Sequence, residues 1–360
     1  MQRRTRFFSA SRSCSGLPRG DYLRELAGYW HSGFDWKIHE RRWNQLPHFR
    51  TEIDGLDIHF IHIRGHGRNP LPLVLTHGWP SSFLEYGKII PLLTDPQATG
   101  GRTEDAFDVI IPSLPGYGFS ARPAEVGMTK ARIAKIWAEL MSERLGYRTF
   151  CAHGGEIESG VTNQLGLNHA GKVLGFHVMA VARPWLGLGS APLTAEELRY
   201  QATLSDWDRS EAGYCHMHRS RPQTLGYSLA DSPAGLAAWI VEKLRNWSDC
   251  GGNIAARFSK EEISAILTLY WATETITSSM RLYYDDTHFQ PLPGPDTLIT
   301  ALSTIALTTE AVSRAPRSWA KRTYTNLQRW TEFPKGGHFM AHEEPAMLAG
   351  DLREFFRPFR

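Results

Sequence analysis

Residues 149–160, TFCAHGGEIESG, join a short apolar run to a glycine-rich turn. An apolar run of this length, bounded by turn residues, is typical of a strand buried in a parallel sheet. The same kind of run recurs on both sides, at 71–76, 107–112 and 173–181. Stretches with helical spacing separate these runs, and strands that alternate with helices predict a mostly parallel, doubly wound sheet.

The alternation of strands and helices stops between about residue 183 and residue 292. This interval contains helical patterns, at 233–247 and 260–280, and no convincing buried strand. We interpret it as a helical cap inserted into the sheet domain. Two further apolar runs and a final helix are expected after the cap, at 297–307, 325–333 and near 343–356.

The segment before the first buried run predicts a helix and a hairpin. Apolar residues recur at helical spacing within 22–30, and residues 49–62 alternate between apolar and polar around Asp54-Gly55. An Asp-Gly pair in this setting is typical of a two-residue hairpin turn. Two more helices are expected between the buried runs, at about 81–93 and 129–145.

Composition is that of an ordinary globular protein. The 360 residues suffice for one large catalytic domain with an insertion, or for two domains. A net charge of +3 is too small to favour nucleic-acid binding. The four cysteines form no C-x-x-C pair, which argues against a structural zinc site or a disulfide framework and favours a reducing compartment. Because no run reaches the ~18 apolar residues that span a bilayer, we expect a cytoplasmic protein.

The first fifteen residues are basic, rich in serine and free of acidic residues. We interpret residues 1–16 as a disordered tail or as a misplaced start of the gene. Their composition is also typical of a mitochondrial transit peptide, and that alternative stays open. The rest of the chain is expected to divide into three parts: an N-terminal segment at 17–70, a sheet domain at 71–182 and 296–360, and the cap at 183–295.

The turn at 154–160 (GGEIESG) has features of a nucleophile elbow. Such an elbow needs small residues two positions before and two positions after the nucleophile. Glu156 fits best, because Gly154 meets the first requirement, although Glu158 does not meet the second. Ser159 fits less well as the nucleophile. An ordinary glycine-rich turn with two exposed glutamates is the alternative.

Other candidate residues also follow predicted strands. The turn at 77–80 (HGWP) exposes backbone N–H groups that can stabilise an oxyanion. His338, after two glycines on a loop beyond the last strand, is placed to act as a general base. Glu310 is the preferred acid to orient this histidine, and Glu332 is the alternative. His342 is expected at the surface.

With these motifs in place, the chain resembles the microsomal-type epoxide hydrolases, including juvenile-hormone epoxide hydrolases and their fungal relatives. The resemblance runs from about residue 17 to the end of the chain. It is carried by matching segments at 29–36, 49–62, 77–80, 231–238 (DSPAGLAA), 278–283 (SSMRLY) and 336–339 (GGHF). It implies an α/β-hydrolase fold with an N-terminal meander and an inserted helical cap. It also implies an enzyme, without metal or cofactor, that opens a lipophilic epoxide to a vicinal diol in detoxification or secondary metabolism.

The resemblance implies a role for each matching residue of the sheet domain. A carboxylate at the position of Glu156 attacks the epoxide and forms an ester. His338, oriented by Glu310, then activates the water that cleaves this ester. The backbone N–H groups of Trp79 and Ile157 are the implied oxyanion donors.

Two cap tyrosines are implied to hydrogen-bond the epoxide oxygen. Tyr214 and Tyr283 match this role, and packing within the cap is the alternative reading. Tyr227 and Tyr284 are nearby competitors, and Tyr283 is preferred because it aligns with the segment at 278–283.

The elbow departs from the family pattern at two positions. The family has aspartate where this chain has Glu156, and a small residue where it has Glu158. One extra methylene moves a carboxylate by roughly 1–1.5 Å, and displacement on this scale costs about 10²-fold in rate. Two alternatives therefore stay open: a non-covalent epoxide-opening cyclase or lactone hydrolase, and a non-catalytic binding member of the family.

Metal and partner sites are not indicated. His216 and His218 alternate in the cap without a third ligand at matching spacing, so we expect them to be solvated. The glycine-rich turn lacks the lysine of a phosphate-binding loop. A small lipophilic epoxide is the expected partner, and formation of a homodimer is left open.

Overall fold

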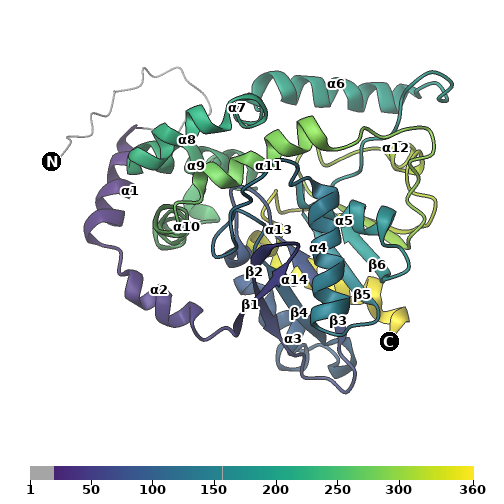
Figure 1. The fold of residues 1–360 in the computed structure, drawn as a ribbon, viewed down its shortest axis with the longest axis horizontal. Helices are drawn as coiled ribbons and strands as arrows, with labels where there is room; N and C mark the ends of the chain where they lie inside the picture. Colours follow the sequence, from purple (N-terminus) through teal and green to yellow (C-terminus); the bar gives the residue numbers. More distant parts are fainter. Residues whose placement is uncertain (1–19, 156) are drawn as a thin grey trace.

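The computed structural model describes residues 20–155 and 157–360, so the predicted tail at 1–16 lies outside the described residues. Its centre is an eight-stranded sheet in the order β1-β2-β4-β3-β5-β6-β7-β8 (Figure 1). The strands are β1 (His48–Ile53), β2 (Leu56–Ile63), β3 (Leu71–Thr76), β4 (Phe107–Pro112), β5 (Phe150–Gly154), β6 (Val173–Val178), β7 (Ser303–Leu307) and β8 (Leu327–Glu332). β1, β2 and β4 pair antiparallel, and every pair from β4 to β8 is parallel. The predicted, mostly parallel sheet is confirmed.

Helices cover both faces of the sheet, as the alternation of side chains along each strand requires. Ala152 of β5 faces the core shared with α4 (Lys130–Glu139) and α5 (Ile157–Asn168). Its neighbour Cys151 faces the opposite core, shared with α3 (Ile90–Thr94) and α14 (Pro345–Phe356). The strands from β3 to β7 are thereby buried on both faces, which explains why they appear in the sequence as largely apolar runs with few polar residues.

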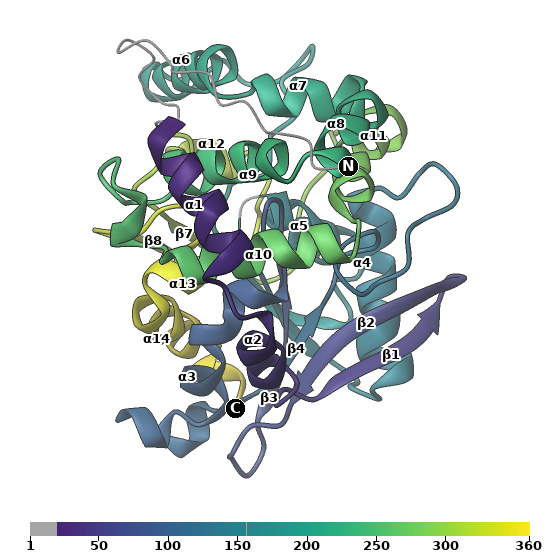
Figure 2. The same cartoon turned by 90° about the vertical axis from the view of Figure 1, so that its left-hand side faces the viewer.

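The N-terminal segment forms the predicted helix and hairpin. Asp54 and Gly55 join β1 to β2 with positive φ angles of 53° and 74°, as a two-residue turn of this type requires. Figure 2 shows the hairpin projecting beside the sheet. The helices are α1 (Gly20–Ser32) and α2 (Trp36–Trp43). Trp30 of α1 donates its indole N–H to Thr268 Oγ1 at 2.8 Å, which ties this segment to the cap.

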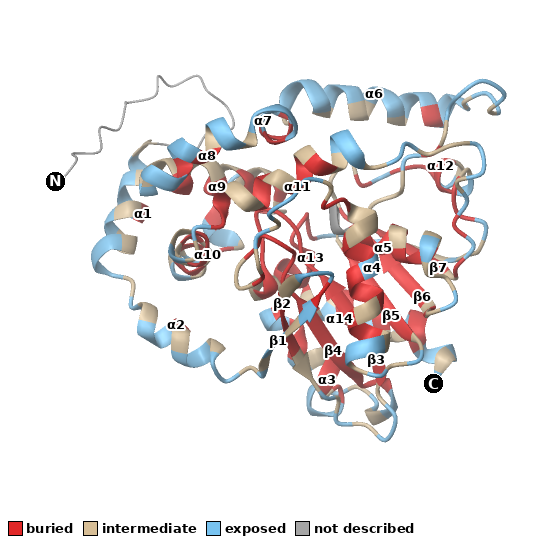
Figure 3. Cartoon of the chain, in the orientation of Figure 1, coloured by how far each residue is buried: buried red, intermediate tan, exposed pale blue. Residues whose placement is uncertain are grey.

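The interval predicted to form the cap, 183–295, is helical, and it contains no strand. Its helices are α6 (Ala195–Ser210), α7 (Gly213–Ser220), α8 (Pro222–Asp231), α9 (Pro233–Trp247), α10 (Lys260–Ala272) and α11 (Ile276–Phe289). The helical pattern at 260–280 is present but is not one continuous helix. It is divided into α10 and α11 at Glu274, whose φ of 52° lies in the left-handed region and interrupts the helix. Figure 3 shows that α6 is mostly exposed, whereas the helices nearer the sheet carry buried faces.

The prediction of one continuous helix at 81–93 is wrong. A 3-10 helix at Phe83–Lys88 precedes the short α3, because Pro91 has no N–H group to donate within a longer helix. The helix expected at 129–145 is present as α4, followed by a π-helical turn at Leu140–Arg144. The last helix is preceded by α13 (Met340–Glu343), and α12 (Arg317–Lys321) lies between β7 and β8. Within the described ranges, no helix has the length and apolar character needed to cross a bilayer.

Candidate active site

Four loops carry the residues singled out in the sequence, and each follows a parallel strand. The HGWP turn follows β3, the glycine-rich turn follows β5, Glu310 follows β7, and His338 follows β8. The carboxyl ends of parallel strands lie at one edge of a sheet, so these loops meet there. The cap helices lie over this edge (Figure 1).

The glycine-rich turn is a short connection between strand and helix. β5 ends at Gly154 and α5 begins at Ile157. Glu156 lies between them, outside the described residues, so its role as nucleophile stays a prediction. Ile157 is the first residue of α5, and backbone N–H groups in the first turn of a helix have no acceptor within that helix. The backbone of Ile157 is therefore available for the expected role of oxyanion donor.

Ser159 ties the elbow to the next strand. Its buried Oγ donates to the Gly154 carbonyl at 3.1 Å. It also accepts from the backbone N–H groups of Met179 and Ala180, at 3.2 and 3.1 Å. These contacts make Ser159 a brace between β5, α5 and the end of β6.

The HGWP turn is held by its own histidine. His77 is buried, and its Nε2 accepts from the backbone N–H of Leu114 at 3.2 Å. Its Nδ1 lies 3.3 Å from the Gly78 carbonyl, to which it donates. Burial lowers the pKa of His77 to about 4, so the ring is neutral and can both donate and accept. The turn, with a cis peptide bond between Trp79 and Pro80, is thus fastened to the end of β4.

The structure brings His338 and Glu310 together. His338 Nδ1 lies 3.8 Å from Glu310 Oε2, and both side chains are largely buried. This separation is longer than a hydrogen bond, and such catalytic contacts often shorten only when substrate binds. Thr309 connects the two loops, because its N–H and its hydroxyl both donate to the Gly336 carbonyl, at 3.0 and 2.9 Å.

The alternative acid and the second histidine lie elsewhere. Glu332, at the exposed end of β8, pairs with Arg314 at 3.4 Å. The expectation that His342 is a surface residue is wrong. His342 is buried, its ring stacks on Phe258 at 4.3 Å, and its Nε2 lies 3.0 Å from the Arg257 carbonyl. The short helix α13 turns this side chain inward beneath the cap.

Tyr214 of α7 and Tyr283 of α11 face each other in the cap. Their ring centroids are 5.9 Å apart at 82°, and the indole of Trp79 stacks on Tyr214 at 5.3 Å. Both tyrosines line a cavity of about 890 Å³ between the cap and α5. Tyr227 and Tyr284 line a different groove, on the outer side of α8 and α11.

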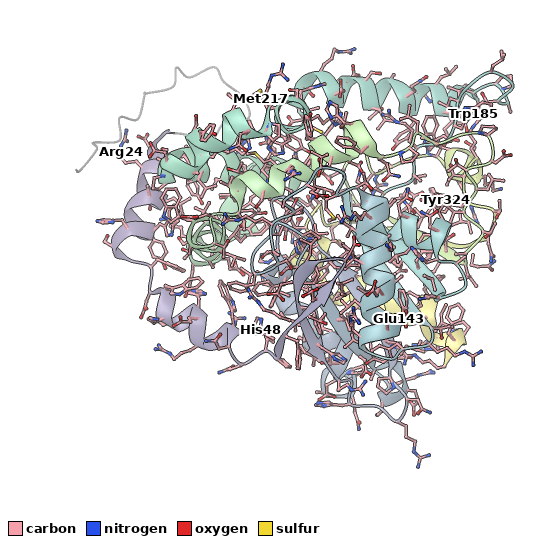
Figure 4. The ribbon with its side chains drawn as sticks, in the orientation of Figure 1. Arg24, His48, Glu143, Trp185, Met217 and Tyr324 are labelled. Carbon is pink, nitrogen blue, oxygen red and sulfur yellow. The ribbon has the colours of Figure 1, made fainter. Side chains whose placement is uncertain are left out.

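Tyr324, labelled in Figure 4, connects α5 to the segment that leads into the cap, beside the cavity of the two tyrosines. Its hydroxyl donates to Asn163 Oδ1 at 2.8 Å and accepts from the N–H of Ala182 at 2.9 Å. Asn163 and Ala182 line the cavity of the two tyrosines. Burial raises the pKa of Tyr324, so the hydroxyl stays protonated and holds α5 against the start of the cap.

The expectation that His218 is solvated is wrong. Its side chain is fully buried, and its Nε2 accepts from the Trp239 indole N–H at 3.2 Å. Its ring lies 4.9 Å from Tyr283 and 5.4 Å from Tyr214. His218 and Tyr214 are four residues apart on α7 and so share one helix face, a spacing visible in the sequence. His216 points outward and lies 3.5 Å from Asp208.

Two further residues of α9 lie near this site and carry no signal in the sequence patterns. Lys243 is buried, with its ammonium 4.9 Å from the ring centre of Tyr214 and 2.6 Å from Glu242. Trp247 lies with its ring centre 4.9 Å from both Tyr214 and His338. This indole therefore joins the tyrosine pair of the cap to the histidine of the sheet domain.

Comparison with known proteins identifies the family. A protein of Stigmatella aurantiaca is 44% identical over 94% of this chain and 76% of its own length. Epoxide hydrolase 1 of Sus scrofa is 36% identical over 93% of this chain and 79% of its own length. This chain belongs to the epoxide hydrolase family. The model for the epoxide hydrolase N terminus matches residues 3–86 of this family member.

Solved structures agree with this assignment. The crystal structure of juvenile hormone epoxide hydrolase from Bombyx mori superposes on this epoxide hydrolase with a TM-score of 0.86 at 29% identity, covering 99% of this chain and 89% of that one. Aspergillus niger epoxide hydrolase superposes with a TM-score of 0.83 at 29% identity, covering 99% and 90%. The expected α/β-hydrolase fold is confirmed. These relatives favour epoxide hydrolysis over the cyclase, lactone-hydrolase and binding alternatives.

Proposed function

We propose that this epoxide hydrolase opens a lipophilic epoxide to a vicinal diol through an ester on Glu156. The main support is the continuous contact from the cap to the sheet domain. Tyr214 and Tyr283 face one cavity, and Trp247 connects Tyr214 to His338, which lies beside Glu310. The tyrosine pair and the histidine with its proposed acid thus both lie next to the Trp247 ring, which supports the proposal of a single site.

In the first step, a carboxylate oxygen of Glu156 attacks one oxirane carbon. The C–O bond breaks, and its electron pair passes to the oxirane oxygen. Tyr214 and Tyr283 stabilise the alkoxide, and one of them gives it a proton, since a phenol with an ordinary pKa of about 10 is a far stronger acid than an alcohol. The product is a hydroxyalkyl ester of Glu156.

In the second step, His338 takes a proton from water, and the resulting hydroxide attacks the ester carbonyl. Glu310 stabilises the imidazolium and holds its tautomer. The N–H groups of Trp79 and Ile157 stabilise the tetrahedral oxyanion. Collapse of this intermediate breaks the bond from the carbonyl carbon to the alkyl oxygen. The departing alkoxide takes the proton of the new carboxylic acid, so the diol leaves and Glu156 is again a carboxylate. The His338 imidazolium returns its proton, through water, to the tyrosinate left by the first step.

A single turnover in ¹⁸O-labelled water tests the covalent route. Enzyme in excess over styrene oxide should give unlabelled diol and one ¹⁸O in the tryptic peptide that contains Glu156, read by mass spectrometry. The reason is that the first diol takes its new oxygen from the carboxylate, and water replaces that oxygen in the enzyme. Labelled diol with an unlabelled peptide would show direct attack by water and contradict the ester.

The cavity suggests which epoxides fit. Its walls include Leu167, Trp207, Leu282, Leu292 and Ile299, a lining that favours an alkyl or aryl chain. The tyrosines at its base are buried, whereas Arg183 and Arg219 line its exposed mouth. Three basic residues and one acidic residue line the cavity in all: Lys130, Arg183, Arg219 and Asp286.

The positive mouth favours an epoxide whose far end is anionic, such as an epoxy fatty acid. Lys130 is paired with Asp286 at 2.6 Å, whereas neither arginine forms an ion pair within the described part of the chain. We expect kcat/KM for the free acid to exceed that for its methyl ester by about fivefold at low salt. The Arg183→Gln/Arg219→Gln double variant should remove this preference and hydrolyse the methyl ester normally.

Arg148→Gln is the matched control, because Arg148 is exposed and precedes β5 at the opposite edge of the sheet. It should keep the preference for the acid. Equal kcat/KM values for acid and ester in the native enzyme at low salt would refute the proposed role of the arginines while leaving epoxide hydrolysis intact.

A further inference from the structure

The loop that carries His338 is held along its backbone. Four consecutive N–H groups of this loop donate to acceptors on neighbouring segments; the donors are Gly336, Gly337, His338 and Phe339. A loop normally has several N–H groups exposed to water, so this arrangement leaves little freedom for the histidine backbone.

A single carboxylate accepts from two of these groups. Glu343 Oε1 accepts from the N–H of Phe339 at 3.1 Å, and its Oε2 accepts from the N–H of Gly337 at 3.2 Å. The two oxygens therefore hold the residues immediately before and after His338. Oε2 also accepts from the N–H of Asp249 at 2.7 Å. The Glu343 side chain is fully buried, with an exposed fraction of 0%.

The cap supplies the other acceptors. Asp249 Oδ2 accepts from the N–H of Gly336 at 2.9 Å, and the Trp247 carbonyl accepts from the N–H of His338 at 2.9 Å. Trp247 is the last residue of α9 and Asp249 lies just beyond it, so hydrogen bonds tie the histidine loop to the C-terminal end of this cap helix.

Arg257 of the cap lies beside the buried carboxylate of Glu343 and offsets its negative charge. Its guanidinium lies 3.6 Å from Glu343, 3.3 Å from Asp249 and 2.9 Å from Glu344. Burial raises the pKa of Glu343, and its three backbone N–H donors and Arg257 act in the opposite direction. A carboxylate with this set of donors forms charge-assisted hydrogen bonds, which are about twice as strong as neutral ones.

We propose that Glu343 is a positioning residue for ester hydrolysis, and that it holds the His338 ring where it can activate water against the ester. The proposal rests on the proposed function of His338 as the base. Glu343 itself does not touch the reacting atoms. Its effect is confined to the second step, because the first step uses Glu156 and the tyrosines and not His338.

This assignment has a kinetic signature. When only the hydrolytic step slows and becomes limiting, kcat and KM fall together, kcat/KM is unchanged, and the ester accumulates. A general loss of folded enzyme lowers kcat and leaves KM unchanged. The two cases are therefore separated by the KM value and by the mass of the intact protein.

Glu343→Gln is the test. The amide offers one acceptor oxygen and places an NH₂ group against a backbone N–H, so one side of the His338 loop loses its anchor. With styrene oxide we expect kcat and KM to fall together by about tenfold or more, since displacement of a catalytic group by about 1 Å costs about 10²-fold. Mass spectrometry of quenched enzyme should show the ester. A lower kcat with unchanged KM and no ester, or wild-type kinetics, would overturn the proposal.

Glu344→Gln is the matched control, with the same chemical change one residue later. Glu344 contacts Arg257 at 2.9 Å and Lys335 at 2.7 Å through its side chain. The four loop N–H groups donate to Asp249, Glu343 and the Trp247 carbonyl and not to this side chain, so kcat and KM should stay near native values. If Glu343→Gln does not fold, Asp249→Asn weakens the acceptor for the Gly336 N–H at a more exposed position and should give a smaller effect of the same kind.

His338→Gln measured in parallel distinguishes failure of the positioning role from failure of the proposed function. If His338→Gln traps the ester and Glu343→Gln does not, the positioning role is refuted and the proposed function stands. If His338→Gln traps no ester, the proposed function fails, and the role of Glu343 fails with it.

Discussion

His338→Gln should lower the turnover of styrene oxide by about 10³-fold and leave most of the enzyme as its ester. General-base catalysis by one side chain contributes about 10²- to 10⁴-fold, and glutamine cannot take the proton from water. Ester formation does not use His338, so the first step should proceed. Intact-protein mass spectrometry should show a mass increase equal to that of the epoxide, located in the peptide with Glu156.

His216→Gln is the control for this variant. His216 is exposed on the cap and points away from the tyrosine pair, so the kinetics of the His216→Gln variant should match those of the native enzyme. Turnover by His338→Gln at a rate near native would show that another group activates the water, and the roles proposed for His338 and Glu310 would be withdrawn.

The second large effect is expected at the nucleophile. Glu156→Asp should raise kcat/KM for styrene oxide by about 10²-fold, because the shorter side chain moves the carboxylate by roughly 1 Å, to the position that aspartate has in the family. Rapid-quench measurement of ester formation should show the gain directly. The hydrolytic step should change less, since it depends on His338.

Glu156→Gln is the companion variant, because it keeps the length of glutamate and removes its charge. It should form no ester, since a neutral amide is a poor nucleophile. A fall in activity on Glu156→Asp would mean that the turn after β5 is fitted to the longer side chain, and glutamate would then be the working nucleophile of this enzyme. Inactivity of both the native enzyme and Glu156→Asp would direct attention to Glu158, whose ionised carboxylate can raise the pKa of a neighbouring acid.

Both experiments test whether the cap and the sheet domain supply the residues for different steps of the proposed reaction. The two tyrosines lie on the cap helices α7 and α11. Glu310 lies on the loop after β7, and His338 lies on the loop after β8. Contacts of Trp247 and Asp249 connect the cap with the histidine loop. In the proposed mechanism, opening of the epoxide depends on the cap tyrosines, and hydrolysis of the ester depends on the histidine loop. The carboxylate of Glu343 links the cap and the histidine loop, since it accepts from backbone groups of both.

The strands, the hairpin, the helical nature of the cap and the order of the loops that carry the candidate residues could all be predicted from the sequence alone. These features depend on local patterns: largely apolar runs, an Asp-Gly turn and glycines after a strand, each of which acts over a few neighbouring residues. The family segments then assigned roles to positions such as Glu156 and His338. Errors in secondary structure came where local chemistry interrupts a pattern, as Pro91 and Glu274 do.

Which of the candidate side chains lie close together depends on tertiary packing and could not be predicted from sequence patterns. Glu310 lies 3.8 Å from His338 whereas Glu332 pairs with Arg314 at the surface. Neighbours on one helix, Tyr283 and Tyr284, line different cavities because successive helical residues point about 100° apart. The burial of His218, His342 and Glu343 depends on how cap helices and loops distant in sequence pack on one another. The sequence pattern of a single segment cannot predict this burial, because the residues that bury these side chains belong to other parts of the chain.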